Sequence, residues 1–450
     1  MSDAAATDQN AAPVGTQPRF GVKDVFRDRE TAFKFTAVLG LQMGQVFPAA
    51  FFGLMLTAIY REKGLPLDMF WVFTLPAIPT WLRPLWAPLV DGVGIARLGL
   101  RKTWFIPCTL FGALAYLSLA LFEPEIATLW IIIGILIIKT TFMTTQDIAI
   151  DGYMVENLRD EERGVGAAVM DIGRNVAQFT SWAGVAWVYG EYGWSAATAV
   201  AASLLILFSL PGIIRREPPP PPEAVASREK GQRPSLIGLL RRPDTRLILP
   251  LIMLISFAGA LIPSLYIAFL VDVGFTVGQI GPLIFAPATL VGTLIGASVT
   301  VWYLNTFGYK KTILTSAILI VPTVIPIVWL GSLDEPSLLI VFLVTLIGIT
   351  LPSFLQVAMA ASRLKWASKS QAATDYTSYI VAATGAAAAA LAVGGVLAEH
   401  LGWFYYFILA GGLVIGACFV FYLLFDRIDA AVEARDRQER GTEPAWPGNQ

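Results

Sequence analysis

Gly99-Leu100-Arg101-Lys102 returns 209 positions later as Gly308-Tyr309-Lys310-Lys311, and each copy follows a long apolar stretch. Loops that combine glycine with basic residues are common, so this match alone says little. Two further pairs of loops share the offset to within one residue: Gly193-Trp194 with Gly402-Trp403, and Gly64-Leu65 with Gly274-Phe275. The common spacing indicates that the chain contains two copies of one unit.

The composition points to a membrane. Of the 450 residues, 56% are hydrophobic and 14% are charged, whereas soluble domains average about 25% charged residues. The net charge of −1 leaves no basic surplus to neutralise the phosphates of a nucleic acid. Cys108 and Cys418 lie far apart inside apolar stretches, and His400 is the single histidine. These residues exclude a disulfide framework and a cysteine-based zinc site, and we expect neither a metal nor a cofactor.

Apolar stretches of about 20 residues are long enough to cross a bilayer as helices. The sequence predicts twelve of them, at residues 31–60, 67–90, 103–122, 126–155, 163–190, 194–214, 246–271, 276–304, 312–332, 337–361, 371–399 and 402–425. The predicted domains are an N-terminal tail (1–30), a six-helix half (31–214), a linker with five consecutive prolines (215–245), a second six-helix half (246–425) and a C-terminal tail (426–450). The N-terminal tail is polar, so we expect no cleavable signal peptide.

Six is an even number, so both halves begin on the same side of the membrane and form a parallel repeat. This is the arrangement of major facilitator transporters. The predicted fold is therefore an all-α membrane protein with the major facilitator fold, twelve transmembrane helices in two six-helix halves. Proline breaks or bends a helix, so the four prolines of the second span (Pro76, Pro79, Pro84 and Pro88) predict a bend there.

The loops carry their basic residues on one side. When the loops are assigned alternately to two sides, 26 lysines and arginines fall on the side of the N-terminus and only Arg61 and Lys63 on the other. Cytoplasmic loops of membrane proteins carry the excess of basic residues. Both termini and the linker are therefore predicted to lie in the cytoplasm.

Charges inside the membrane are costly and usually mark function. At about 1.5 Å per residue, four charged residues lie roughly 12 to 16 Å from the cytoplasmic ends of their spans: Arg83 in span two, Asp147 in span four, and Asp171 and Arg174 in span five. Asp151 lies one turn after Asp147 in span four. Asp147 and Asp151 share a helix face because they are four residues apart. Two interpretations remain open for this group: an ion-pair network or cytoplasmic gate, and a proton relay or a site for a charged substrate.

Six other residues are candidates for substrate binding. Lys139 lies nearest the middle of the membrane, where these folds bind substrate; the alternative is local pairing or a side chain that extends toward the membrane surface. Gln42 and Gln45 in span one line either a cavity or a contact between helices. Gln146 in span four and Gln356 in span ten are repeat counterparts, 210 residues apart. Asp375, near the repeat counterpart of Asp171, either contacts substrate or caps span eleven. Val357 and Ala361 replace the two aspartates of span four in the second half, so the charges are distributed asymmetrically.

Several stretches resemble one family. They are Leu85-Trp86-Ala87-Pro88-Leu89-Val90-Asp91, Thr145-Gln146-Asp147-Ile148-Ala149-Ile150-Asp151-Gly152-Tyr153, Arg163-Gly164-Val165-Gly166-Ala167-Ala168 and Ala398-Glu399-His400-Leu401-Gly402-Trp403. These stretches are similar to the AmpG-type permeases, the peptide/acetyl-coenzyme A transporters of the major facilitator superfamily. The resemblance implies proton-driven import across the bacterial inner membrane, with muropeptides as the cargo of the type member. The start of span eleven departs from the AmpG pattern, because Ala372-Ala373-Thr374-Asp375-Tyr376-Thr377 looks closer to siderophore permeases of the rhizobactin/pyochelin type.

The leading hypothesis is a multi-pass, inner-membrane secondary transporter that imports a bulky polar, muropeptide-like solute together with protons. Its expected partners are that solute, protons and the bilayer, and we expect a monomer. Arg101 and Lys102, with Gly99 and Asp91, form the expected cytoplasmic loop motif between spans two and three. The alternatives are a siderophore permease, a non-transporting membrane assembly factor and a membrane-embedded acyltransferase. The repeat and the paired charges favour a transporter over an enzyme.

Overall fold

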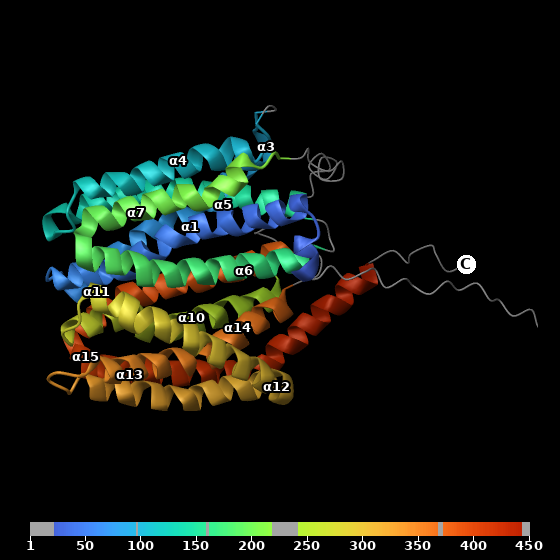
Figure 1. Cartoon of the computed structure of the whole chain (residues 1–450). Helices are drawn as coiled ribbons and strands as arrows, with labels where there is room; N and C mark the ends of the chain where they lie inside the picture. Colours follow the sequence, from blue (N-terminus) through green and yellow to red (C-terminus); the bar gives the residue numbers. More distant parts are fainter. Residues whose placement is uncertain (1–21, 96–97, 159–161, 218–241, 368–371, 443–450) are drawn as a thin grey trace, which may run out of the picture.

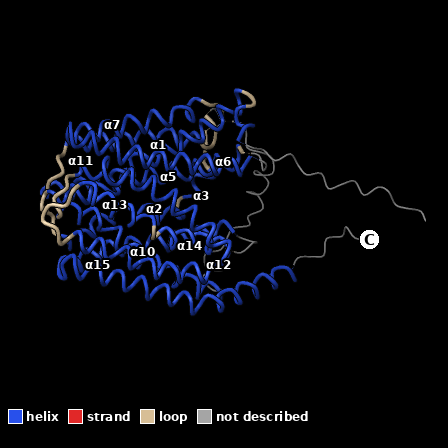
Figure 2. The backbone as a smooth tube through the Cα atoms, turned by 60° about the horizontal axis from the view of Figure 1, so that its bottom comes forward, coloured by secondary structure: helices blue, strands red, loops and turns tan. Residues whose placement is uncertain are grey.

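The computed structural model describes residues 22–95, 98–158, 162–217, 242–367 and 372–442, and nearly all of these are helical. The helices run almost parallel to one long axis and form two stacked groups (Figure 1). The tube view shows the same helical bundle from another side (Figure 2).

The first half consists of helices interrupted by short 3-10 and π-helical segments. In chain order these are η1 (Val22–Phe26), α1 (Arg29–Glu62), η2 (Leu67–Ala77), α2 (Ile78–Leu82), η3 (Arg83–Leu85), α3 (Ala87–Gly92), α4 (Lys102–Ser118), η4 (Leu119–Leu121), η5 (Ile126–Thr128), α5 (Leu129–Asn157), α6 (Arg163–Thr180), the π-helical η7 (Ser181–Val185) and α7 (Ala186–Ile214).

The second half has fewer and longer helices. They are α10 (Pro243–Asp272), α11 (Val277–Gln279), the π-helical η8 (Ile280–Phe285), α12 (Ala286–Leu330), α13 (Leu338–Thr350), α14 (Ser353–Trp366) and α15 (Ala372–Thr442).

The described residues contain eight helical stretches that are long and apolar enough to cross a membrane. Three of these stretches change direction at a glycine with a positive φ, namely Gly193 in α7, Gly308 in α12 and Gly402 in α15. Each of the three therefore crosses twice. The broken helix η2–α2–η3–α3 supplies the remaining crossing, so the twelve predicted spans are confirmed.

The prolines of the second span act as predicted. Pro76 lies inside η2, and α2, η3 and α3 each begin with a proline in their first two positions. A proline removes one backbone hydrogen bond and clashes with the preceding turn. The span is consequently divided into four short pieces instead of one continuous helix.

The backbone repeats between the halves. Each glycine with a positive φ in the first half has its partner 209 or 210 residues later with a similar φ: Gly64 with Gly274, Gly99 with Gly308, and Gly193 with Gly402. Residues with a side chain rarely adopt this conformation, so the three loops are built in the same way in both halves. The duplication inferred from the sequence is therefore present in the backbone.

Large apolar side chains cover the outside of the bundle. Leu110, Leu114 and Leu117 on α4, and Ile318 and Ile325 on α12, are all exposed. Such a broad apolar surface is stable against lipid but not against water.

The bundle has two ends. We call the end where α1 begins at Arg29 and α10 begins at Pro243 the terminal face, and the end where these helices finish, at Glu62 and Asp272, the opposite face. The last turns of α15 extend beyond the terminal face, while α11 lies at the opposite face (Figure 1).

Candidate functional site

A group of charged side chains lies inside the first half. Arg83 of η3 donates from Nη1 to Oδ2 of Asp147 on α5 at 2.9 Å, and each side chain is about a quarter exposed. Two further bonds hold the broken second span to α5: Thr80 to Thr144 at 3.2 Å, and the indole nitrogen of Trp86 to Thr145 at 3.1 Å. The structure thus pairs two of the predicted charges and fixes the four-piece span onto α5.

Asp151 lies one turn beyond Asp147 on α5, and its residue is exposed. It is close enough to Asp147, Arg83 and Arg174 for their charges to act on its carboxyl group. Arg174 is exposed on α6. We call Arg83, Asp147, Asp151 and Arg174 the charge cluster. The side chain of Asp171 lies outside the described part of the chain, so its predicted membership is not tested.

Lys139 faces a different part of the first half. The residue is 7% exposed, and its Nζ lies 5.3 Å from the ring centroid of Tyr116 on α4. Tyr116 is fully buried and stacks on Phe52 of α1 at 4.9 Å. A cation over an aromatic ring is stabilised by the electron density of the ring face. Lys139 therefore lies in the packing between α4 and α5, and a substrate contact stays a prediction.

The glutamines occupy unlike surroundings. Gln146 is fully buried, and its Nε2 donates to Thr109 Oγ1 on α4 at 2.6 Å. Gln42 is buried on α1, and Gln45 is half-buried there. Gln356 on α14 is exposed and lines a cavity. Gln356 is thus the glutamine whose position best fits substrate binding, whereas Gln146 bonds to a neighbouring helix.

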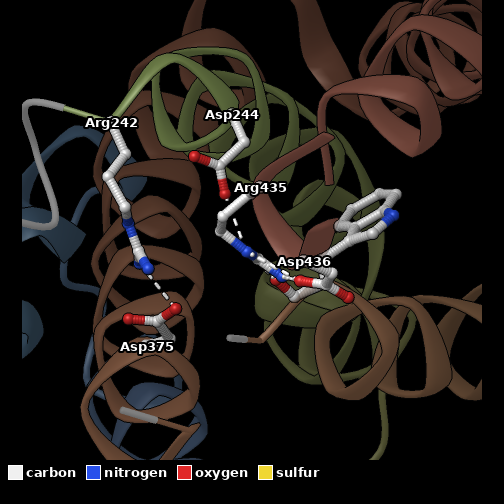
Figure 3. A network of polar contacts seen from close by, with 6 residues as sticks. Arg242, Asp244, Asp375, Arg435 and Asp436 are labelled. Carbon is white, nitrogen blue, oxygen red and sulfur yellow. Dashed lines mark hydrogen bonds and ion pairs between the residues drawn. The ribbon is translucent and has the colours of Figure 1, made fainter. Parts of the chain in front are cut away.

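Asp375 belongs to a polar network at the terminal face of the second half (Figure 3). Its carboxylate is fully buried and lies 2.5 Å from Nη2 of Arg242, just before α10. Beside this pair, Arg435 donates to Asp244 at 2.7 Å and to the carbonyl oxygen of Trp366 at 2.9 Å. Arg242 balances the charge of Asp375 without any substrate, although no measurement yet tests the predicted substrate contact.

The two basic loops are held by equivalent acidic residues. The backbone N–H groups of Arg101 and Lys102 donate to the Glu217 carboxylate at about 3.0 Å, beside the positive-φ Gly99. In the second half, Lys310 donates to Asp426 at 2.7 Å. Asp426 is 209 residues after Glu217, and Lys310 is 209 residues after Arg101. The repeat thus extends to the contacts that fix these loops. The side chain of Asp91 lies outside the described part of the chain.

The halves are joined at the opposite face. Arg61 at the end of α1 donates to both carboxylate oxygens of Asp272 at the end of α10, at 2.6 and 2.7 Å. Two carboxylates accept backbone N–H groups of the other half: Glu62 from Val277 at 2.6 Å, and Glu399 from Leu67 at 2.9 Å. We call Arg61, Asp272, Glu62 and Glu399 the clasp.

The clasp lies beside a very close backbone contact. A Cβ atom added at Gly190 on α7 would lie 2.9 Å from Cα of Gly278 on α11, and one added at Gly278 would lie 3.0 Å from Cα of Gly190. Only glycine allows two helices to approach this closely. The halves therefore touch backbone to backbone at the opposite face.

In the part of the chain that the structure describes, three ion pairs near the terminal face each lie within one half. Lys34 on α1 pairs with the fully buried Glu162 at 2.6 Å, and the Lys310–Asp426 and Arg435–Asp244 pairs lie inside the second half. Lys34 is itself buried, so this pair lies inside the first half. Each half thus stabilises its own terminal end, whereas the clasp joins the two halves at the other end.

A cavity of about 320 Å³ lies inside the second half. Its walls come from α10, η8, α12, α13, α14 and one residue of α15, and they include Tyr266, Phe285, Ser316, Thr345, Gly348 and Gln356. Of these residues, the sequence singled out only Gln356, because the others are scattered over four elements.

The sequence of the chain is similar to those of known membrane transporters. The family profile of the Major Facilitator Superfamily matches residues 35–352 and, in a second match, residues 248–448. An anhydromuropeptide permease of Escherichia coli (strain K12) is 26% identical over 264 residues, which cover 58% of this chain and 53% of that protein. The match thus spans about half the length of that curated relative. A Rickettsia conorii protein named putative transporter AmpG 4 is 23% identical over 395 residues, covering 82% of this chain and 91% of that protein.

Solved structures share the fold at low identity. The nucleoside transporter NupG superposes with a TM-score of 0.66 at 12% identity, covering 86% of this chain and all of that one. The POT family transporter PepTSo gives a TM-score of 0.65 at 10% identity, covering 88% and 97%. These structures confirm the predicted fold, and the relatives confirm the resemblance to AmpG-type permeases. Because the family profile matches both six-helix halves, the chain belongs to the Major Facilitator Superfamily.

Proposed function

We propose that this protein is a proton-coupled secondary transporter that imports a bulky polar solute of the muropeptide class across the bacterial inner membrane. The observation that carries the proposal is the clasp. Among the described residues, it joins the two halves at one face, while three ion pairs near the other face each lie within one half. This arrangement fits a transporter that alternates between two openings by moving one half against the other.

The proposed orientation places the terminal face in the cytoplasm. It follows from the 26 basic residues on that side against two on the other. Both tails and the 215–245 linker are then cytoplasmic, and the clasp closes the outer side. The described conformation is accordingly the one that exchanges solute with the cytoplasm.

The charge cluster supports proton coupling. Asp147 is engaged by Arg83, whereas Asp151 is exposed one turn away. An exposed carboxyl group at membrane depth beside a second carboxylate is suited to take up and release a proton as its surroundings change. We assign that role to Asp151, with the Arg83–Asp147 pair as its fixed neighbour, and we propose that the protein works as a monomer.

The muropeptide class comes from two relatives, which are named anhydromuropeptide permease and putative transporter AmpG 4. It is tested by uptake of a labelled anhydromuropeptide into proteoliposomes that contain the purified protein. With an imposed inward proton gradient we expect accumulation that a protonophore abolishes. A labelled ferric siderophore chelate serves as the competing cargo; accumulation of the chelate alone, or of neither compound, contradicts the proposal.

The clasp itself is tested by Arg61→Gln. This change removes both hydrogen bonds to Asp272 and so lowers the cost of separating the halves at the opposite face. We expect a larger population with that face open, seen as longer distances between spin labels introduced by Glu123→Cys and Glu335→Cys. These two residues lie in loops of different halves at that face.

Lys63→Gln is the matched control, because Lys63 carries the other basic charge of the same face on an exposed side chain. It is expected to leave the distance distribution unchanged. Equal distributions for Arg61→Gln and the wild type show that the clasp does not hold the outer side closed.

A further inference from the structure

The cavity in the second half has a distinctive chemistry. Among the described residues that line it, none carries a charge, and most are apolar. Hydroxyl and amide groups interrupt the apolar walls, on Tyr266, Thr293, Ser316, Thr323, Thr345, Ser353 and Gln356. Ligand pockets in proteins are typically apolar with a few placed polar groups.

Most of these hydroxyl groups already donate a hydrogen bond within the protein. Ser316, Thr323 and Thr345 donate to carbonyl oxygens of their own helices at 2.8 to 2.9 Å. Because Thr345 donates to Val341, the 2.8 Å contact between Tyr266 and Thr345 leaves the Tyr266 hydroxyl as the donor. A hydroxyl that has given its proton still has an oxygen lone pair free to accept. The cavity therefore favours a ligand that brings O–H or N–H donors, and Gln356 adds one amide that both donates and accepts.

The cavity also reaches the contact between the halves. Phe285 lines it, and its ring meets that of Trp182 in the first half edge to face, with the ring centroids 5.2 Å apart. Both aromatic residues lie in π-helical segments, Phe285 in η8 and Trp182 in η7. Such segments are rare and occur frequently at functional sites. A ligand in the cavity would thus touch a side chain that packs across the interface.

We propose that this cavity is the subsite for an uncharged sugar ring that carries hydroxyl and N-acyl groups. The inference rests on the proposed function and specifies its cargo. The volume of the cavity, about 320 Å³, lies at the lower end of the range of roughly 300–1,000 Å³ that ligand pockets span. That space suits a single ring better than an entire sugar-peptide.

Gly348→Leu tests the subsite by filling it. A Cβ atom added at Gly348 meets only the side chain of Ile327, at 4.0 Å, so a larger side chain enters open space. The probe is N,N′-diacetylchitobiose, an uncharged N-acetylated disaccharide, with cellobiose as the sugar that lacks the amide. We expect the first probe to raise the Tm of the wild-type protein in detergent and Gly348→Leu to abolish that increase. Cellobiose is expected to give a smaller increase.

Gly412→Leu is the matched control, since Gly412 is exposed on the same half and a Cβ there has no neighbour within 4 Å. Gln356→Leu is a second variant that removes the amide without filling the space, and it is expected to reduce the Tm increase. If Gly348→Leu does not fold, this variant still decides the question. An unchanged Tm increase in the cavity variants overturns the subsite.

The two proposals fail in different ways. If the wild type accumulates the anhydromuropeptide and is stabilised by the disaccharide, but neither cavity variant changes this, the subsite is wrong and the transport proposal stands. If the wild type accumulates no muropeptide, the proposed function itself is wrong. Stabilisation by the disaccharide that is lost in Gly348→Leu would then still support the cavity as a sugar site.

Discussion

Asp151→Asn is expected to reduce proton-driven uptake by more than about tenfold, as removal of a group that transfers protons commonly does. The amide keeps the size of the side chain but cannot gain or lose a proton. Exchange of labelled for unlabelled cargo across the same vesicles needs no net proton movement, so it is expected to persist. The measurement is the ratio of gradient-driven accumulation to exchange in proteoliposomes.

Asp334→Asn is the control for this variant. Asp334 is an exposed carboxylate in a loop after α12, so its replacement is expected to change neither rate. If Asp151→Asn loses accumulation and exchange together, its carboxylate is needed for cargo binding or for the conformational change. If it retains gradient-driven accumulation, Asp151 is not the proton carrier.

Asp244→Ala is expected to cost about 3–5 kcal/mol of stability, the usual loss when one partner of a buried ion pair is removed. The Asp244 side chain is 2% exposed and that of Arg435 is 9% exposed, so the variant leaves an arginine charge poorly solvated. The neighbouring Asp436 still accepts from Arg435 at 2.8 Å, which places the expected loss toward the lower end. A fall in the Tm of the purified protein checks the direction.

An exposed ion pair on α15, the helix that carries Arg435, provides the control. Arg437 and Glu433 form an ion pair at 3.2 Å with side chains more than two thirds exposed, and Glu433→Ala is expected to cost less than about 0.5 kcal/mol. The double variant Asp244→Ala/Arg435→Met removes both charges together and is expected to recover most of the lost Tm. A Tm as low as that of Asp244→Ala would show that the contacts of Arg435 with Trp366 and Asp436, not its pairing with Asp244, stabilise this end.

Much of the fold follows from local sequence. Apolar length predicts the spans and the prolines predict the broken second span, because each of these signals acts within a few turns of one helix. The repeat is predicted because the loops of the two halves match at one common offset. The pairing of Arg83 with Asp147 was accessible for a related reason. Depth along a helix can be counted from its end, and charges of opposite sign at one depth tend to meet.

The remaining features depend on how helices rotate and pack. Gln146 and Asp147 are adjacent in sequence, yet successive residues of a helix point about 100° apart. One therefore bonds to α4 and the other to Arg83. The partners Arg61 and Asp272 are 211 residues apart, and no local pattern links them. The cavity takes single residues from several helices, so its hydroxyl groups look like ordinary helix residues in the sequence.

The contact between Gly190 and Gly278 has a mechanical consequence. The contact lies at one end of the bundle, whose helices are about as long as α10 with its 30 residues, or roughly 45 Å. A tilt of about 10° at such a point carries the far end of a helix of that length through roughly 8 Å. The missing side chains of these two glycines thus keep this end closed, since a Cβ atom at either one would lie about 3 Å from Cα of the other and push the halves apart there.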